Sequence, residues 1–102
     1  MKYAKRVDLN HGEIRDFLRA VVGMKILDTS GMAGLGCDLI AFYQDMPPQF
    51  LEIKSGPKDP LTDKEKRLKA LSANAGTWHR VDSIEGALRV FGISTERAPD
   101  TW

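Results

Sequence analysis

This sequence has little of several features that define common protein classes. It contains one cysteine and two histidines in 102 residues. A single cysteine excludes a disulfide within the chain, which fits a reducing cytoplasm, and so few scattered cysteines and histidines argue against a structural zinc site. The 15 basic residues nearly balance the 14 acidic ones. No overall basic field therefore indicates a nucleic-acid partner.

Long apolar runs are also missing. No run approaches the roughly 20 apolar residues of a membrane-spanning helix, and the start of the chain lacks the apolar segment of a secretory signal. The apolar content of 42% nevertheless favours a folded protein over a disordered one. We therefore expect one cytoplasmic domain over residues 1–102, not associated with a membrane and loosely held at its ends, about 1–8 and 94–102.

Helical and strand patterns alternate along the chain. Apolar residues at helical spacing predict a helix over residues 9–22 that ends at Gly23, and residues 24–27 predict a first strand. Thr62 and Glu65 form a capping box that opens a helix to about residue 75. Residues 78–81 predict a further strand, and Ser83 caps a last helix that Gly92 ends. The order predicts an α/β fold with a mixed central sheet flanked by helices.

Two short strands in the middle of the chain form a predicted hairpin. Residues 38–43 and 50–54 are rich in aromatic and β-branched residues, and the loop between them, 44–48, contains two prolines that do not suit an interior strand. Closure of the hairpin near residues 45–47 would place Asp38 opposite Lys54, with Glu52 as its diagonal neighbour. Glu52 and Lys54 share one face because side chains alternate along a strand.

Three charged groups on such apolar strands are costly to bury without a partner or a function. Asp38 and Glu52 would lie close enough to bind one cation together, and Mg²⁺ takes one or two carboxylates besides water and phosphate oxygens. Lys54 would then stabilise charge beside a scissile phosphate. The alternative is a structural ion-pair cluster at the end of a hairpin, and the short acid-x-lysine motif by itself does not decide between the two.

The segment Gly36-Cys37-Asp38, followed by Leu51-Glu52-Ile53-Lys54, resembles the catalytic signature of the PD-(D/E)xK nuclease superfamily. The resemblance is closest to the small stand-alone VRR-NUC and Holliday-junction-resolvase-like proteins of phages and bacteria, and it extends over residues 10–13, 28–31, 61–65 and 81–88. The chain departs from the family's pattern at two positions: Cys37 replaces the usual proline, and Glu65 stands where a glutamine is common. The resemblance implies a restriction-endonuclease-like αβββαβ core.

The resemblance also implies an activity and its residues. The chain would be a Mg²⁺- or Mn²⁺-dependent endonuclease that hydrolyses phosphodiester bonds of DNA, with Asp38, Glu52 and Lys54 as catalytic residues. Asp38, Glu52, the carbonyl of Ile53 and the first-helix Glu13 would hold the metal. For Glu13 the alternative is an ordinary first-turn glutamate that complements the helix dipole.

Basic residues after the motif are candidates for binding the phosphate backbone, namely Lys58, Lys64 and Arg67. A basic helix face of this kind is more often simply solvated. Glu65 is explained by the capping box, Cys37 is expected to be a small buried side chain rather than a nucleophile, and Trp78 is expected in the core.

We expect branched or flapped DNA as substrate and a homodimer that presents two active sites. A second interpretation is a non-catalytic DNA-binding or assembly module that keeps the nuclease fold. Two converging carboxylates argue against it, because carboxylates repel phosphates unless a metal intervenes. A third keeps the nuclease but gives it an RNA substrate or a role in a mobile element.

Overall fold

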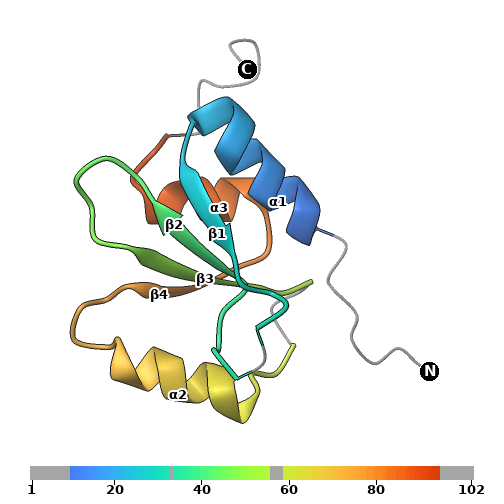
Figure 1. Cartoon of the computed structure of the whole chain (residues 1–102), viewed down its shortest axis with the longest axis vertical. Helices are drawn as coiled ribbons and strands as arrows, with labels where there is room; N and C mark the ends of the chain where they lie inside the picture. The colour runs from blue at the N-terminus through green and yellow to red at the C-terminus, as the bar shows by residue number, and fades with distance from the viewer. Residues whose placement is uncertain (1–9, 33, 56–58, 95–102) are drawn as a thin grey trace.

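The computed structural model describes residues 10–32, 34–55 and 59–94 of the chain (Figure 1). The ends that the sequence predicts to be loose fall outside these residues, apart from Ser94. The elements follow in the predicted order of helix, three strands, helix, strand and helix. They are α1 (His11–Phe17), β1 (Lys25–Asp28), β2 (Leu39–Phe42), β3 (Gln49–Ile53), α2 (Asp63–Leu71), β4 (Trp78–Val81) and α3 (Ile84–Val90).

The four strands form one mixed sheet in the order β1-β2-β3-β4. β1, β2 and β3 pair antiparallel, and β4 joins β3 in parallel. A parallel neighbour needs a crossover, and α2 provides it between β3 and β4. These pairings confirm the prediction of an α/β fold with a mixed sheet.

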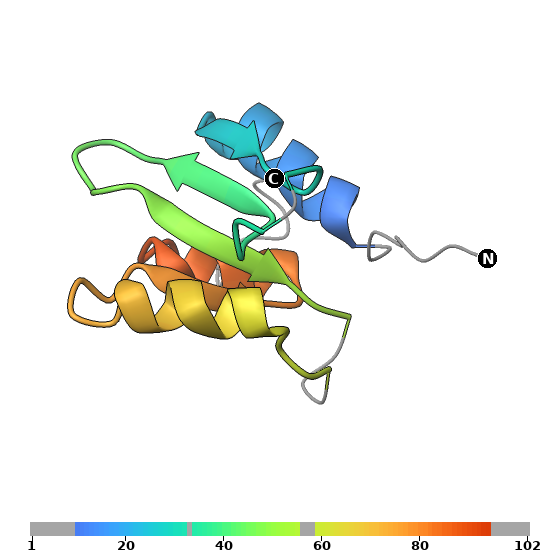
Figure 2. The ribbon, with the colours of Figure 1, turned by 60° about the horizontal axis from the view of Figure 1, so that its bottom comes forward.

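The helices differ in how they contact the sheet. α1 and α3 pack against each other and against the buried face of the sheet, whereas α2 lies along β4 (Figure 2). α2 has no buried residue. It contacts the rest of the chain at Gly36, which lies against Lys64 and Leu68, and at the Trp78 ring, which the Lys69 ammonium approaches. Within the described residues, no helix is long and apolar enough to cross a membrane.

Two observed helices differ from the predicted ones, the first in helix type and the second in length. The first runs as an α-helix only to Phe17 and continues as one π-helical turn over Leu18–Val22. It ends at Gly23, which adopts the left-handed conformation at φ 83° as expected. α2 ends at Leu71, not near residue 75, and residues 72–76 form turns instead.

The pairing register of the β2–β3 hairpin corrects the sequence prediction. Ala41 pairs with Gln49 and Leu39 with Leu51. Continued by one residue, this register places Asp38 directly opposite Glu52, and Lys54 becomes the diagonal neighbour. Gln49, which lay between the predicted loop 44–48 and the predicted strand 50–54, belongs to β3. Its buried side chain donates to the carbonyl of Pro47 at 2.9 Å and contacts His79 at 2.7 Å.

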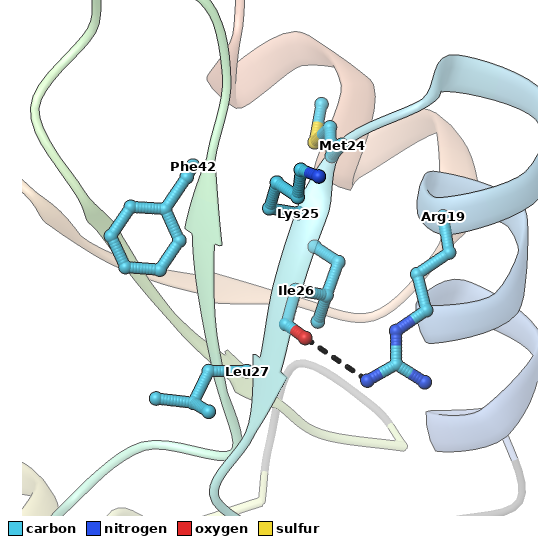
Figure 3. Close-up of a pocket in the computed structure, with 6 residues that line it drawn as sticks. All are labelled: Arg19, Met24, Lys25, Ile26, Leu27 and Phe42. Carbon is cyan, nitrogen blue, oxygen red and sulfur yellow. Dashed lines mark hydrogen bonds between the residues drawn. The ribbon is translucent and has the colours of Figure 1, made fainter.

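The β1 edge of the sheet carries an apolar groove of about 370 Å³ (Figure 3). Leu27 and Phe42 line it with exposed side chains, 53% and 42% accessible. Arg19 lies on the other side of β1 and donates to the carbonyl of Ile26 at 3.0 Å. This hydrogen bond occupies one backbone acceptor of β1. The unpaired backbone groups of an edge strand can otherwise pair with another strand.

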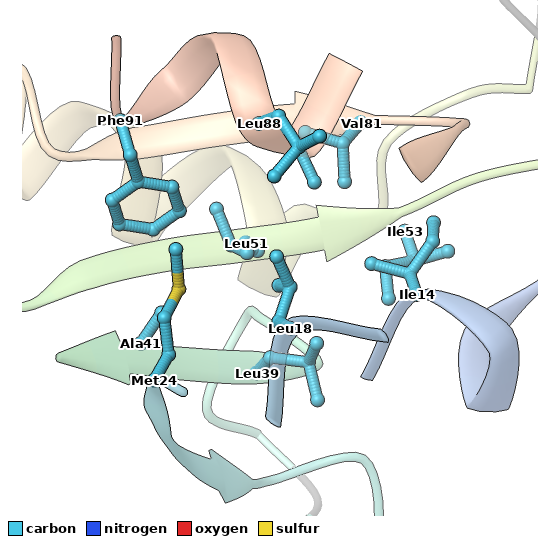
Figure 4. Close-up of a cluster of buried hydrophobic side chains, with 11 residues drawn as sticks. Ile14, Leu18, Met24, Leu39, Ala41, Leu51, Ile53, Val81, Leu88 and Phe91 are labelled. Carbon is cyan, nitrogen blue, oxygen red and sulfur yellow. The ribbon is translucent and has the colours of Figure 1, made fainter. Parts of the chain in front are cut away.

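The hydrophobic core lies between the sheet and the helices α1 and α3 (Figure 4). The sheet contributes alternate residues of β2 and β3, because only every second side chain of a strand faces the core. The buried apolar residues of this core are Ile14, Leu18, Met24, Leu39, Ala41, Leu51, Ile53, Val81, Ala87, Leu88 and Phe91. The core fixes the strand ends at which the charged residues of the motif lie.

Candidate active site

The loop before β2 holds Asp38 in place through its backbone. Thr29, almost fully buried, donates its hydroxyl to the carbonyl of Cys37 at 2.9 Å and its N–H to the carbonyl of Asp38 at 2.8 Å. Cys37 is buried as expected, and burial raises the pKa of its thiol to about 11. The thiol is therefore protonated near neutral pH and is not an activated nucleophile.

Gly36 brings this loop into contact with α2. A Cβ atom at Gly36 would meet the carbonyl oxygen of Lys64 at 2.5 Å, and the residue has φ 98°, which L side chains rarely adopt. The carbonyl of Gly36 accepts the indole N–H of Trp78 at 3.1 Å. Trp78, expected in the core, is only partly buried. The first turn of α2, the loop and β4 thus meet beside Asp38.

Asp38 and Glu52 face each other across the end of the hairpin. The N–H of Asp38 donates to the carbonyl of Leu51, and its carboxylate accepts the N–H of Ile53, both at 2.9 Å. Burial raises the pKa of Asp38, although the hydrogen bond from Ile53 and the nearby His11 act in the opposite direction. The sequence prediction that these two carboxyl groups converge is confirmed at the level of geometry.

Glu52 is the most perturbed acid of the site. Its residue surface is only 4% exposed. Burial first, then the hydrogen bond with Glu65 and the charges of Asp38 and Glu65, raise its pKa to about 9. Lys54 lowers the pKa but does not offset these effects. At neutral pH the Glu52 carboxyl is therefore held in its neutral form, because a second buried negative charge beside Asp38 is unfavourable.

Lys54 lies between two glutamates. Its ammonium is 3.1 Å from Oε1 of Glu65 and 3.5 Å from Oε2 of Glu52. Burial disfavours the ammonium, but the hydrogen bond and charge of Glu65 and the charge of Glu52 outweigh burial and raise the pKa of Lys54. Lys54 is thus a charged partner in the site, and Glu65 is its nearest carboxylate.

Glu65 belongs to the site as well as to the capping box. The predicted box is present: Thr62 accepts the N–H of Glu65, and Oε1 of Glu65 accepts the N–H of Thr62 at 2.9 Å. Burial would raise the pKa of Glu65, but hydrogen bonds from Glu52, Thr62 and Lys54 lower it. The capping box alone explains a glutamate at this position, so the sequence pattern did not indicate its second role in the site. The available signal was that a glutamate at this position of a helix reaches back toward the preceding chain.

A cavity of about 140 Å³ opens at this cluster. Its charged lining consists of Asp38, Glu52, Lys64 and Glu65, and Gly34, Gly36 and Cys37 of the preceding loop also line it. The groove at β1 is larger, but no carboxylate lines it. The smaller polar cavity is therefore the candidate for chemistry.

The other predicted site residues lie at different distances from this cluster. The backbone of Ile53 is next to Asp38 through its N–H. Glu13 is exposed on α1 and does not line the cavity. Lys64 lines the cavity, whereas Arg67 is exposed further along α2. Lys58 lies outside the described residues.

A second polar cluster, which the sequence patterns did not predict, joins α1 to β1. His11 is only 3% exposed and lies 3.2 Å from Oδ2 of Asp28, which also accepts from Arg15 at 2.8 Å. Despite the cost of burial, these contacts and those from Ser30 hold the pKa of Asp28 well below its usual range. Hydrogen bonds within the cluster satisfy Asp28, so it stabilises the packing of α1 on the sheet.

Asn10 ties the same end of α1 to the strands that carry the site. It occupies the position before the helix, as expected for an N-cap, but its side chain makes no capping hydrogen bond. Instead its amide donates to the carbonyl of Asp82 at 2.7 Å and to that of Lys54 at 3.4 Å. Asn10 thereby fixes the backbone just after β3.

The donor groups of the cavity suit a small divalent cation. Among the described residues, no group of three or more histidine, cysteine, aspartate or glutamate side chains forms a preassembled metal cluster. Mg²⁺ needs no such cluster, because one or two carboxylates with water and substrate oxygens complete its shell. Asp38 and Glu52 supply such a pair. Burial is the main cause of the raised pKa of Glu52, and the charges of Asp38 and Glu65 add to it; a bound cation would offset those charges. Asp38 and Glu52 therefore fit a small divalent cation such as Mg²⁺ or Mn²⁺.

The fold and the site define a small mixed α/β domain with an acidic, lysine-containing cavity at one end of its sheet. Comparison with known proteins adds no family to this description. No protein-family model matches the chain, and neither a curated protein nor a solved structure matches it.

Proposed function

We propose that this protein is a Mg²⁺- or Mn²⁺-dependent endonuclease that hydrolyses phosphodiester bonds of DNA, with a restriction-endonuclease-like core. The observation that carries the proposal is the pair of opposed carboxyl groups, Asp38 and Glu52, which line one cavity. The Lys54 ammonium lies 3.5 Å from Oε2 of Glu52. The resemblance of the motif to PD-(D/E)xK nucleases gives this geometry its chemical interpretation.

Asp38 and Glu52 would hold the cation, and the carbonyl of Ile53 is a further candidate ligand beside them. When bound, the cation would polarise the scissile phosphate and make a water molecule a better nucleophile. The protein's own contribution is to hold two carboxyl groups at a fixed separation on paired strands, so that little reorganisation is needed. Glu13 would join only if its exposed side chain turned toward the cavity.

Lys54 supplies positive charge where negative charge develops on the phosphate. Lys54 follows directly after β3, and the side-chain amide of Asn10 donates to its carbonyl, so the backbone that carries the ammonium is held in place. A cation held in this way stabilises the transition state more than a freely solvated one, because it is already oriented. Loss of Lys54 should therefore reduce kcat more than it changes substrate affinity.

The basic residues of α2 provide a path for the DNA backbone away from the cavity. Lys64 lines the cavity and Arg67 is exposed one turn further along the same helix. Each would contribute a phosphate contact, together with Lys58. These contacts carry no sequence information, so they support cleavage guided by DNA shape rather than by base sequence.

Branched or flapped DNA is the proposed substrate form, and a homodimer is the proposed assembly, because two sites at fixed separation suit cuts on two strands. Sedimentation that gives a monomer at micromolar concentration would remove the dimer. Cleavage of a panel of plasmid, single-stranded, flapped and four-way-junction DNA, with matching RNA, in Mg²⁺, Mn²⁺ or EDTA would test the function and rank the substrates.

The second candidate is a DNA-binding or assembly module without catalysis. Thermal unfolding with and without metal separates the two functions, because a cation that binds only the folded state at 100 times its Kd adds about 2.7 kcal/mol of stability. We expect Mn²⁺ to raise the Tm of the wild type and not of Asp38→Asn, with the exposed hairpin variant Asp45→Asn as matched control. No metal effect in the wild type, with DNA still retained, would favour the binding module.

A further inference from the structure

The apolar groove at the β1 edge has no role in the proposed chemistry. We propose that it holds an unpaired strand of the DNA substrate, with a base stacked on the exposed ring of Phe42 and a phosphate beside Lys25. The inference rests on the proposed nuclease function and deepens it, because it names single-stranded DNA next to the cleavage site as part of the substrate.

The sheet face that carries Leu27 and Phe42 is exposed at β1 and β2. α1 and α3 pack on the opposite face, and α2 contacts β4 (Figure 2). Leu27 is 53% exposed and Phe42 is 42% exposed, although both side chains are large and apolar. Figure 3 shows the two on the same side of β1. Exposed apolar side chains that lie together on one face indicate a binding surface.

The charges around the groove suit a polyanion. Lys25 is the direct cross-strand partner of Phe42, so the two side chains leave the sheet about 5 Å apart. Arg19 lines the groove from the other side of β1. Among the described residues that line the groove, none is a carboxylate. Proteins bind single strands with this combination, because an aromatic ring stacks on a base while a cation contacts the phosphates.

Phe42 lies on the same sheet face as a carboxyl group of the cavity. Side chains alternate along a strand, so Asp38, Ile40 and Phe42 share one face of β2. The step from Asp38 to Phe42 spans about 13 Å of extended chain, which is the length of about four stacked nucleotides. A strand that is cut at Asp38 and Glu52 therefore reaches Phe42 within a few nucleotides.

A second copy of the chain is the other candidate occupant, and the charges disfavour it. A two-fold interface brings the same surface patch of both copies together. An interface centred on the groove would therefore place Lys25 and Arg19 against their own counterparts, and like charges repel in an interface. DNA meets the same two cations with the opposite charge.

Fluorescence anisotropy with a labelled oligo(dT) in EDTA tests the groove without catalysis, and about 12 nucleotides suit a site of this kind. We expect Phe42→Ala to weaken binding about tenfold, as loss of one base stack does. Phe42→Leu should weaken it similarly, because leucine keeps apolar area but has no ring face. Lys25→Gln should reduce the salt slope by about 0.7, the contribution of one phosphate contact on a single strand.

Matched controls lie away from the groove. Leu71→Ala removes an apolar side chain that is 77% exposed at the end of α2, and Arg89→Gln removes an exposed cation from α3. Neither should change the affinity measurably. An oligonucleotide of the same length without bases keeps the phosphates but cannot stack, so it should bind the wild type and Phe42→Ala equally.

Cleavage then tests whether the groove serves the proposed site. With Mg²⁺ or Mn²⁺, the ratio of flap cleavage to blunt-duplex cleavage should fall about tenfold in Phe42→Ala, because a blunt duplex offers no unpaired base to the ring. An unchanged ratio would contradict a role in holding the unpaired strand.

The results separate the inference from the proposed function. Unchanged oligonucleotide binding by Phe42→Ala and Lys25→Gln overturns the inference, even where the wild type cleaves DNA. Loss of a dimer in these variants by sedimentation, with that binding unchanged, would assign the groove to a second copy instead. Wild type that binds the oligonucleotide through Phe42 but cleaves no DNA contradicts the nuclease function and leaves the groove as a site for single strands.

Discussion

Replacement of Glu52 by glutamine should stabilise the protein, and increasingly so as the pH rises. The Glu52 carboxyl is buried, and burial with two acidic neighbours raises its pKa from 4.5 to about 9. In the unfolded chain the same carboxyl ionises freely above pH 4.5. The folded state must therefore keep a proton that the unfolded state releases.

The sign and size of the effect follow from this difference. A raised folded-state pKa contributes stability that is fully present below pH 4.5 and is lost as pH rises toward 9. At pH 7, roughly 2.5 pH units above the ordinary glutamate pKa of 4.5, holding the proton costs about 3 kcal/mol, as an upper bound. Glutamine does not titrate, and its amide carries two N–H donors that can serve Asp38 and Glu65, whereas the protonated carboxyl donates a single hydrogen bond. We therefore expect Glu52→Gln to gain up to about 3 kcal/mol at pH 7 and about 1 kcal/mol near pH 5.5.

Urea unfolding at pH 5, 7 and 8.5, followed by tryptophan fluorescence, measures these differences. Glu13→Gln is the matched control, because Glu13 is exposed and the variant should show no pH-dependent gain. A difference between Glu52→Gln and the wild type that does not grow with pH would refute the reasoning. So would a variant that is less stable than the wild type at every pH.

Three further predictions concern the loop, the metal and the DNA path. Gly36→Ala should lower the free energy of unfolding, measured in urea, by about 3 kcal/mol, because its Cβ would collide with the carbonyl of Lys64. Gly34→Ala, whose Cβ would meet nothing within 4 Å, should lower it by about 1 kcal/mol through backbone strain alone. Equal losses in the two variants would contradict the close contact at Gly36. Mn²⁺ binding should release close to one proton from Glu52, and the affinity for Mn²⁺ should increase as pH rises toward 9. Calorimetry in buffers of different ionisation enthalpy measures this proton release, and its absence would contradict the raised pKa of Glu52. Lys64→Gln and Arg67→Gln should each weaken DNA binding by anisotropy and reduce its salt slope by about 1, and an unchanged slope would remove that residue from the DNA path.

The order of elements was predictable because local patterns determine it. Thr62 with Glu65 marked the start of α2, and Ser83 marked that of α3; both caps are present. The hairpin register was not predictable from the same patterns. It depends on Gln49, a polar residue after two prolines that joins β3 because its amide finds partners in Pro47 and His79. The contact with His79, 30 residues away, leaves no signal in the local sequence.

The candidate site was also predictable from the sequence only in part. The convergence of Asp38 and Glu52 followed from two adjacent strands, although the exact register required the structure. The role of Glu65 required knowledge of where α2 lies, and the close contact at Gly36 determines that position. Long-range contacts therefore decide which of several plausible charged residues belong to the cavity.

The central claim is tested most directly by metal-dependent DNA cleavage with wild type and Glu52→Ala side by side, and with Asp45→Asn as control. We expect cleavage by wild type and Asp45→Asn in Mg²⁺ or Mn²⁺, none in EDTA, and none by a Glu52→Ala variant that still folds. Cleavage by folded Glu52→Ala at the wild-type rate would contradict the proposed role of Glu52. Absence of cleavage by the wild type on every substrate, together with unfolding of Glu52→Ala, would support a structural ion-pair cluster instead.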